Sequence, residues 1–261
     1  MRAGHCLTQN PKNKRECAEK NFMKQENPSW LSSLERDGFV LIPNVLNDDV
    51  VDRLIISLEA EHKNNHAIRN LLQVVPEVRQ LVESATVRAL VEPVLCPAAF
   101  AARGLFFDKT PEANWKVPWH QDLTIAVRSR IEAPGFGPWS VKSGVHHVQP
   151  PTEILEPMVT VRLNLDDCTE QNGPLRVLPE SHRFGKLTPG AIRELRDRTS
   201  AVSCVAKRGG ALLMRPLLLH ASSRALSPYH RRIIHLEFAA ELLPEGLEWL
   251  KAVEEAVAEA E

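Results

Sequence analysis

Hydrophobic positions follow a helical spacing in the first hundred residues. A helix is predicted after Asn47, a suitable N-cap. Its apolar stripe comprises Val50, Val51, Leu54, Ile55 and Leu58. A second helix is predicted to begin at Pro76 and to be closed by Pro93. A short helix, a turn at Gly38 and a strand ended by Pro43 precede both, so this part of the chain is predicted to be mainly helical.

Beyond Pro97, short apolar runs alternate with Pro and Gly, which is the pattern of short strands. Strands are predicted at 100–107, 123–127, 159–165, 175–178, 202–205, 211–214, 217–220 and 232–239. The intervals are too short for crossover helices, except where Thr188 and Pro189 open a helix to about Asp197. The predicted fold is therefore mainly β with flanking α, a jelly roll with N-terminal helices packed on one sheet. The Glu- and Ala-rich segment from Leu243 predicts a terminal helix.

Composition limits the class of protein. The 261 residues, 43% of them hydrophobic, suit a flexible tail over 1–27 and a single domain over 28–261. There are 32 basic and 33 acidic residues without a block of like charge, so neither nucleic acid nor a membrane surface is an expected partner. No apolar run approaches the roughly 20 residues of a membrane span. We expect a soluble, cytoplasmic monomer or homodimer with a small-molecule substrate.

The number and spacing of the cysteines also agree with a cytoplasmic protein. Five cysteines are scattered along the chain without CxxC spacing, which disfavours both a disulfide framework and a structural zinc site. We therefore expect reduced thiols.

The stretch WKVPWHQDLTIAV contains the first candidate for chemistry. His120 and Asp122 lie two residues apart at the start of an expected strand, where alternate side chains point to the same side. Both could reach one ion, as two of the three ligands of a non-haem Fe(II) site. The spacing alone is not specific, because 10 histidines and 33 acidic residues give 10 × 33/261, about 1.3, such pairs by chance. A second pair is present at His235 and Glu237.

Position along the chain distinguishes the two pairs. His235 is the last histidine and lies within a predicted strand, which favours a hydrogen-bonded or substrate-facing role. His120 is followed a hundred residues later by His220, at the end of an apolar strand that a two-sheet fold can bring back. The alternative for His220 is an ordinary strand-end histidine. Arg231 opens the final strand and could bind a carboxylate with two hydrogen bonds, or form a surface ion pair.

Four features, taken in order, resemble the phytanoyl-CoA dioxygenase family. They are WHQD (119–122), NGPLRVLPESH (172–182), LLLHASS (217–223) and Arg231. The similarity spans about three quarters of the chain, from Asp37 to Phe238. The family consists of Fe(II)- and 2-oxoglutarate-dependent oxygenases on a double-stranded β-helix, which is a cupin-like jelly-roll barrel.

The resemblance implies roles for individual residues and an activity. It implies an iron triad of His120, Asp122 and His220, and it implies that Arg231 and Ser222 bind the distal carboxylate of 2-oxoglutarate. It further implies that the protein uses O2 to hydroxylate an unactivated C–H bond of a small metabolite, with release of succinate and CO2.

The sequence departs from the family pattern at two positions. Arg162 stands where the namesake enzymes place a tryptophan beside 2-oxoglutarate, and we expect it to line the cosubstrate pocket. Glu180 replaces the glycine of a PGSH motif, which implies a tolerated or a shifted turn. We assign His182 of that motif to the scaffold. Lys109 and Trp115 precede the His120 strand and could also reach the cosubstrate pocket.

Residues 127–156 form a long insertion rich in Gly, Pro and basic residues, predicted to be an irregular lid or specificity loop. Candidate contacts with a polar or anionic substrate are Arg128, Trp139, Lys142 and His147. Surface charge, with a tryptophan anchoring the loop, is the alternative for each. Two alternatives to the oxygenase also stay open: a catalytically silent sensor that binds metal and 2-oxoglutarate, and a zinc or manganese cupin-like hydrolase or isomerase in which Arg231 binds substrate.

Overall fold

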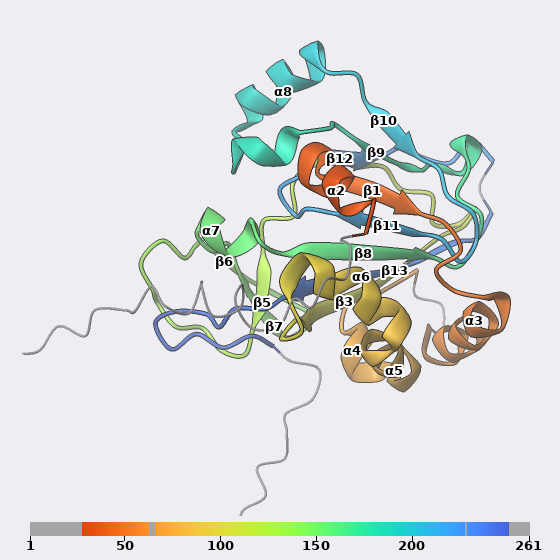
Figure 1. The fold of residues 1–261 in the computed structure, drawn as a ribbon, viewed down its shortest axis with the longest axis horizontal. Helices are drawn as coiled ribbons and strands as arrows, with labels where there is room; N and C mark the ends of the chain where they lie inside the picture. Colours follow the sequence, from red (N-terminus) through yellow and green to blue (C-terminus); the bar gives the residue numbers. More distant parts are fainter. Residues whose placement is uncertain (1–27, 63–65, 228, 251–261) are drawn as a thin grey trace, which may run out of the picture.

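Two β-sheets face each other and form the centre of the molecule (Figure 1). The computed structural model describes residues 28–62, 66–227 and 229–250. In order, the six-stranded sheet contains β1 (Phe39–Ile42), β11 (Ala211–Met214), β8 (Val159–Asn164), β13 (Arg231–Ala239), β3 (Phe100–Lys109) and β2 (Ala67–Ile68). The four-stranded sheet contains β10 (Val202–Cys204), β9 (Leu175–Val177), β12 (His220–Ser222) and β4 (Val117–His120). The predicted mainly β architecture is confirmed.

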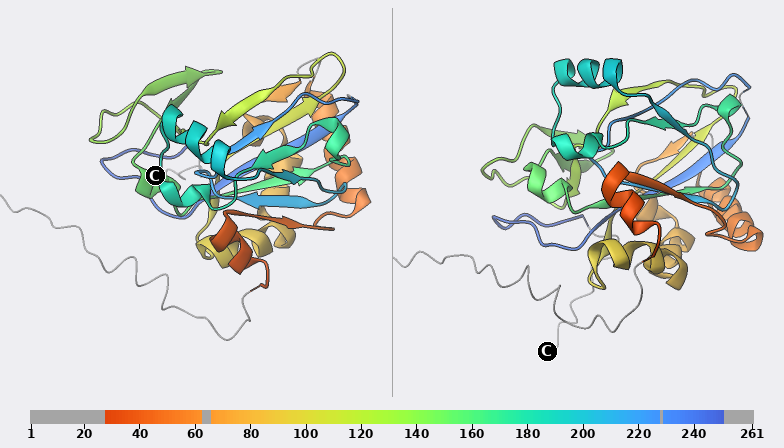
Figure 2. Two further views of the ribbon diagram at one scale, coloured as in Figure 1. Left: turned by 90° about the horizontal axis from the view of Figure 1, so that it is seen from above. Right: turned by 45° about the horizontal axis from the view of Figure 1, so that its top comes forward.

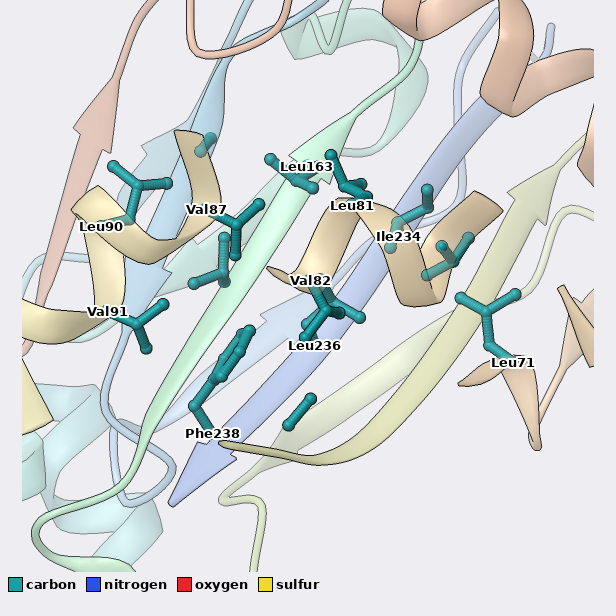
Figure 3. Packing of buried hydrophobic residues seen from close by; sticks show 14 of the residues in the cluster. Leu71, Leu81, Val82, Val87, Leu90, Val91, Leu163, Ile234, Leu236 and Phe238 are labelled. Atoms are coloured by element: carbon teal, nitrogen blue, oxygen red, sulfur yellow. The ribbon is translucent and has the colours of Figure 1, made fainter. Parts of the chain in front are cut away.

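Helices from the N-terminal part of the chain cover the outer face of the six-stranded sheet, whereas α8 lies near β10 (Figure 1). In chain order the described helices are α2 (Leu31–Asp37), α3 (Asp48–His62), α4 (Leu71–Val74), α5 (Pro76–Glu83), α6 (Ala85–Leu95), α7 (Thr152–Leu155) and α8 (Pro189–Arg198), with 3-10 turns η1 (Glu170–Asn172) and η2 (Ser181–Phe184). Leu81 and Val82 of α5 and Val87 of α6 pack on Leu163 and Leu236 of the sheet (Figure 3). The predicted packing of N-terminal helices on one sheet is therefore confirmed. None of the helices in the described ranges is long and apolar enough to cross a membrane.

This packing decides which strand residues face the inside of the barrel. Val161 and Leu163 of β8 and Ile234 and Leu236 of β13 are fully buried under the helices. Because successive side chains of a strand alternate between its faces, their neighbours in sequence point between the two sheets. The inner face of the six-stranded sheet is therefore the wall on which buried polar side chains gather.

The predicted helix starts at Asn47, Pro76 and Pro189 are confirmed, but the end predicted at Pro93 is not. The amide of Val50 donates to Asn47 Oδ1 over 2.9 Å, so the predicted N-cap of α3 is confirmed, and α8 begins at Pro189 as predicted. The single helix predicted from Pro76 to Pro93 is wrong, because Ser84 ends α5 and caps α6 through the amide of Val87. Pro93 lies inside α6, which ends at Leu95.

Two further corrections concern loops. Residues 127–156 are not an irregular loop: they contain the hairpin of β6 (Trp139–Lys142) and β7 (Val145–Val148), which joins β5 (Ile125–Val127) in a third sheet. Figure 2 shows this sheet at one end of the two larger ones. The helix predicted from Leu243 does not form in its described part, because Glu245 and Gly246 have positive φ angles and Trp249 bridges to Val127. Its continuation beyond 250 and the predicted tail over 1–27 lie outside the described residues.

Candidate active site

Strand pairing brings His120 and His220 side by side. β12 runs antiparallel to β4, and His220 is paired directly with His120 across the two strands. Their ring centroids are 4.2 Å apart. His220 opens β12, although the predicted strand ended there. Asp122 lies just after β4 rather than within a strand, and its amide donates to the carbonyl of Pro216 over 2.9 Å.

The three side chains converge on one point. Asp122 Oδ1 is 3.7 Å from Nε2 of His120, and Asp122 Oδ2 is 3.7 Å from Nε2 of His220. Together the three groups meet the spacing of a metal site. His220 is 3% exposed, whereas the His120 side chain is 38% exposed, so the point can be reached from solvent.

Backbone carbonyls orient both imidazoles toward this point. Nδ1 of His120 is 2.9 Å from the carbonyl of Pro118, and Nδ1 of His220 is 2.8 Å from the carbonyl of Leu218. A carbonyl only accepts, so in each neutral ring Nδ1 carries the hydrogen and Nε2 keeps its lone pair for a metal. Burial lowers the pKa of His220 to about 4, which keeps that ring neutral near pH 7.

Asp122 supplies the anionic ligand of the set. Burial alone would raise its pKa, but His220, His235, His120 and Arg103 together lower it to about 2. Its Oδ2 is buried and has no hydrogen-bond partner among the described residues. An unpartnered buried carboxylate oxygen is costly, and a divalent cation would satisfy it. This carboxylate and the two free Nε2 atoms fit Fe(II).

The second His-x-acid pair lies next to the first but is bonded differently. Arg162 Nη1 is 2.8 Å from Nδ1 of His235. Because a guanidinium can only donate, Nδ1 of His235 accepts, and the hydrogen of the neutral ring is on Nε2. That atom is 3.2 Å from Glu237 Oε1 and 4.0 Å from Asp122 Oδ2. His235 is therefore hydrogen-bonded, as the sequence favoured, and its Nε2 has no lone pair for a metal.

A cluster of cations lies at the end of the barrel where β13 begins. Arg231 is paired with Lys109 of β3, and both side chains are buried. Lys109 Nζ donates to Ser222 Oγ over 2.8 Å and to the carbonyl of Ser223 over 2.6 Å. Arg231 donates through Nη1 to the carbonyl of Gly173, while its Nε is buried without a partner. Arg231 and Ser222, which the resemblance implied, therefore bond the same carbonyl of Gly173, and Lys109 joins them through Ser222.

The cationic side chains at this end lack an ion-pair partner among the described residues, although Asp108 accepts from the backbone amide of Arg231. Burial, with the charge of Arg231, lowers the pKa of Lys109 to about 7 and that of Arg162 to about 10. None of the three cations forms an ion pair with a described carboxylate. The charge of Arg231 lowers the pKa of Arg162, whereas that of Asp122 raises it, so Arg162 interacts with both ends of the site. Two buried cations, Arg231 and Lys109, with the partly buried Arg162 beside them and no ion-paired carboxylate among the described residues, fit a dicarboxylate.

The scaffold motif supports this cluster. Gly173 has φ +70°, and a Cβ on it would lie 2.6 Å from the carbonyl of Ser223, so glycine is required. Glu180 adopts φ +65°, so the turn of the PESH segment is tolerated rather than shifted. His182 packs against Gly38 and bonds the carbonyl of Glu35, outside the metal cluster.

The predicted substrate residues divide into two groups. Arg128 forms an exposed ion pair with Glu248 at 3.0 Å, and Trp139 packs in a small apolar cluster with Arg130 over its ring. Neither contacts the metal cluster. His147 and Lys142 of the β6–β7 hairpin lie within electrostatic range of Arg103 and Glu237. Lys109 Nζ lies over the indole ring of Trp115, 5.8 Å from the ring centroid.

Sequence reasoning did not identify two residues of the site. Gln121, between the candidate ligands, is buried and bonds the carbonyls of Gly185 and Leu217, which fixes the turn that carries Asp122. Arg103 faces the barrel from β3 and bonds Glu237. Because side chains alternate along the strand FAARGLFFDK, Arg103 lies on the same face as Lys109. This alternation is the sequence signal that could have identified Arg103.

Comparisons with known proteins agree with the geometry. The family model for phytanoyl-CoA dioxygenase (PhyH) matches residues 34–233. An ectoine dioxygenase of Bordetella parapertussis is 22% identical over 259 residues, covering 84% of this chain and 77% of that protein. The same values hold for the ectoine dioxygenase of Bordetella bronchiseptica.

Solved structures share the fold at lower identity. EctD from S. alaskensis with 2-oxoglutarate and 5-hydroxyectoine has a TM-score of 0.65 at 18% identity, covering 85% of this chain and 79% of that one. The 2-oxoglutarate-dependent carbocyclase SnoK from nogalamycin biosynthesis has a TM-score of 0.62 at 14% identity, with 83% and 84% covered. These likenesses confirm the predicted jelly roll. The chain belongs to the phytanoyl-CoA dioxygenase family of Fe(II)- and 2-oxoglutarate-dependent oxygenases.

Proposed function

We propose that His120, Asp122 and His220 bind Fe(II), and that the protein uses 2-oxoglutarate and O2 to hydroxylate an unactivated C–H bond of a small molecule. Succinate and CO2 would be the co-products. The observation that carries the proposal is the convergence of two Nε2 lone pairs and an unpartnered carboxylate oxygen on one point.

The protein residues would hold the metal in a preset arrangement. The carbonyls of Pro118 and Leu218 accept from Nδ1 of each ring, which would leave Nε2 of His120 and of His220 as the metal-facing atoms. Gln121 holds the turn that carries Asp122. Bound Fe(II) supplies the activation of O2 with oxidative decarboxylation of 2-oxoglutarate.

The cosubstrate would lie between the cation cluster and the metal. Arg231, with Ser222 and Lys109, is proposed to bind the distal carboxylate, and the free Nε of Arg231 supports this. Arg162 is proposed to line the same pocket nearer the metal, where its charge offsets the anion.

Hydroxylation is the outcome that the curated relatives favour, since both are named ectoine dioxygenase. SnoN, a neighbour with a TM-score of 0.58 at 17% identity, is described as an epimerase, and SnoK as a carbocyclase. The same fold therefore supports several outcomes, and the molecule held beside the metal selects among them.

The proposal is tested by adding Fe(II) and 2-oxoglutarate to the protein without oxygen. A weak visible charge-transfer band is expected, and it should be lost in His120→Ala but kept in the control His182→Gln. Absence of the band in the unaltered protein contradicts the proposal. With oxygen, succinate release that rises with a substrate excludes the silent sensor, and activity with zinc but without oxygen would favour a hydrolase or isomerase.

A further inference from the structure

The inner face of the six-stranded sheet carries its side chains in successive layers. Strand register pairs Arg231 with Lys109, Ile233 with Phe107, His235 with Leu105 and Arg162, and Glu237 with Arg103 and Thr160. At about 3.4 Å per residue, Glu237 lies roughly 20 Å along β13 from Arg231. This is too far for 2-oxoglutarate anchored on Arg231.

The layer of Arg103 and Glu237 comes directly after the metal ligands. His235, two residues before Glu237, is 4.0 Å from Asp122 Oδ2 and marks the level of the metal. With 2-oxoglutarate anchored on Arg231 as proposed, the space on the other side of the metal is the one left for a substrate. Arg103 and Glu237 are the charged pair of that side.

Arg103 and Glu237 form a mostly buried ion pair. Arg103 donates through Nε to Glu237 Oε2 over 2.9 Å and through Nη2 to Oε1, and the side chains are 13% and 5% exposed. A buried ion pair loses hydration and adds little stability for that cost, so its presence beside a reaction centre calls for another explanation.

The pair retains free hydrogen-bonding capacity. A guanidinium has five N–H groups, and two of those on Arg103 bond Glu237, while the other three have no partner in the part of the chain that the structure describes. Glu237 accepts from Arg103 twice and from His235 once, which leaves one of its roughly four lone-pair positions. The pair can therefore donate and accept further hydrogen bonds at the same place.

The pair faces space that solvent can reach. Along β3 the inward side chains of Arg103, Leu105 and Phe107 keep partial exposure, although their neighbours Gly104 and Phe106 are buried under the helices. The β6–β7 hairpin carries the exposed Lys142, which lies within electrostatic range of Arg103 and Glu237.

We propose that Arg103 and Glu237 form the substrate-recognition site and select small zwitterions, molecules with a carboxylate and a protonated nitrogen a few bonds apart. The carboxylate would accept from the free N–H groups of Arg103, and the protonated nitrogen would donate to Glu237. A simple anion would be repelled by Glu237 and a simple cation by Arg103, because both charges act through a poorly screened interior. The inference rests on the proposed function and names its substrate class.

The test uses matched probes on the anaerobic complex with Fe(II) and 2-oxoglutarate. The probes are the twenty protein amino acids, their N-acetyl derivatives and their methyl esters, with a parallel set of dicarboxylates and neutral sugars. We expect at least one free amino acid to shift the visible band and to bind in calorimetry about 10- to 100-fold more tightly than its two derivatives. Equal binding of the derivatives, or a response only to other probes or to none, overturns the inference.

The same experiment keeps the two proposals apart. The band of the complex is recorded before any probe is added. If the band is absent, the proposed function fails. If the band is present and no amino acid changes it, only the zwitterion site fails.

Variants show whether the pair recognises the ligand or merely holds the fold. Glu237→Gln should weaken binding of the zwitterion about 10- to 100-fold while binding of the N-acetyl anion is kept or improved. Arg103→Gln should likewise weaken binding of the zwitterion while binding of the methyl ester, which is a cation, is kept or improved. Should either single variant fail to fold, the double variant Arg103→Glu/Glu237→Arg retains an ion pair and should still discriminate against both derivatives.

The control ion pair lies on α6, behind the sheet, where Arg88 Nε is 2.8 Å from Glu92 Oε1. Arg88→Gln and Glu92→Gln should change none of the relative affinities. An equal loss for every probe in the Arg103 and Glu237 variants would mean a purely structural pair and overturn the inference.

Discussion

Two His-x-acid pairs, His120 with Asp122 and His235 with Glu237, lie side by side, with His235 Nε2 4.0 Å from Asp122 Oδ2. Their histidines carry the ring hydrogen on different nitrogens. In the first pair, the Nδ1 of His120 faces a backbone carbonyl, so Nε2 is free for a metal. In the second pair, the Nδ1 of His235 faces a guanidinium, so Nε2 carries the hydrogen. The comparison teaches that the group behind the ring decides which histidine can be a ligand.

The acidic partners differ in the same sense. Asp122 Oδ2 is buried without a hydrogen-bond partner in the described ranges, whereas both oxygens of Glu237 accept from Arg103. The first carboxylate is available to a cation that is not part of the protein. The second is paired with Arg103 and keeps one lone-pair position for a further donor.

The largest expected difference between the two pairs is in metal affinity. We expect His220→Ala to weaken binding of Fe(II) by roughly 1,000-fold, about 4 kcal/mol, because one of three ligands is lost. His235→Ala should change the affinity by less than about 10-fold. Calorimetry with Fe(II) in the absence of oxygen measures both, and a comparable loss in the two variants would refute the distinction.

The two carboxylates should differ next in their effect on stability without metal. Glu237→Gln leaves Arg103 mostly buried and without its partner, so the free energy of unfolding should fall by about 3 to 5 kcal/mol. The folded state favours the charged form of Asp122, since its pKa is lowered to about 2, so Asp122→Asn should lower the free energy of unfolding by a smaller amount, at most about 2.5 kcal/mol. Denaturant unfolding of the metal-free proteins checks this. A larger loss for Asp122→Asn would reverse the assignment.

The pH dependence of stability tests the first pair by itself. The folded state lowers the pKa of His220 from its ordinary 6.5 to about 4, so between these values the unfolded chain binds more protons. Stability of the metal-free protein should therefore rise as pH increases from 4 to 6.5, with up to about 3 kcal/mol from this group. Unfolding curves of His220→Gln should lack this contribution. An unchanged slope in that variant would show that another group titrates.

The smallest effect concerns the ring tautomers. Nitrogen NMR at neutral pH should find the hydrogen of His120 and His220 on Nδ1 and that of His235 on Nε2. Arg162→Met removes the donor behind His235, but Glu237 still accepts from Nε2, so the hydrogen should stay on Nε2 while the unpartnered Nδ1 costs about 1 kcal/mol of stability. Arg162→Lys, which can still donate, is the matched control. A Nδ1 hydrogen on His235 in the unaltered protein would remove the basis of the comparison.

The sequence was sufficient for much of the fold, since helical and strand periods lead directly to the N-terminal helices and to strands such as β8 and β11. Sequence-based prediction failed where a contact elsewhere in the fold overrode the local preference of a segment. Pro93 was expected to end a helix but lies in its last turns, and the Glu- and Ala-rich end was expected to be helical although Trp249 bridges to Val127. The hairpin of residues 139–148 was missed because Gly and Pro suggested irregular structure.

The candidate ligands followed from motif order and family resemblance rather than from spacing, which His235 and Glu237 matched equally well. Arg231 and Ser222 were also expected at the cosubstrate site from the resemblance, and Lys109 was expected to reach the same pocket. Arg103 was not, because an arginine in a strand has no visible partner in the sequence, and Glu237 lies 134 residues away.

The sequence alone determined the elements and the kinds of side chain, because alternation and helical spacing are local properties of the chain. The tertiary structure decided which polar groups meet inside the barrel. Pairing of β4 with β12 brought His120 to His220, and pairing of β8 with β13 put Arg162 behind His235. A hydrogen-bond partner can come from any distance along the chain, so only the folded sheets determine which imidazole keeps a lone pair for a metal.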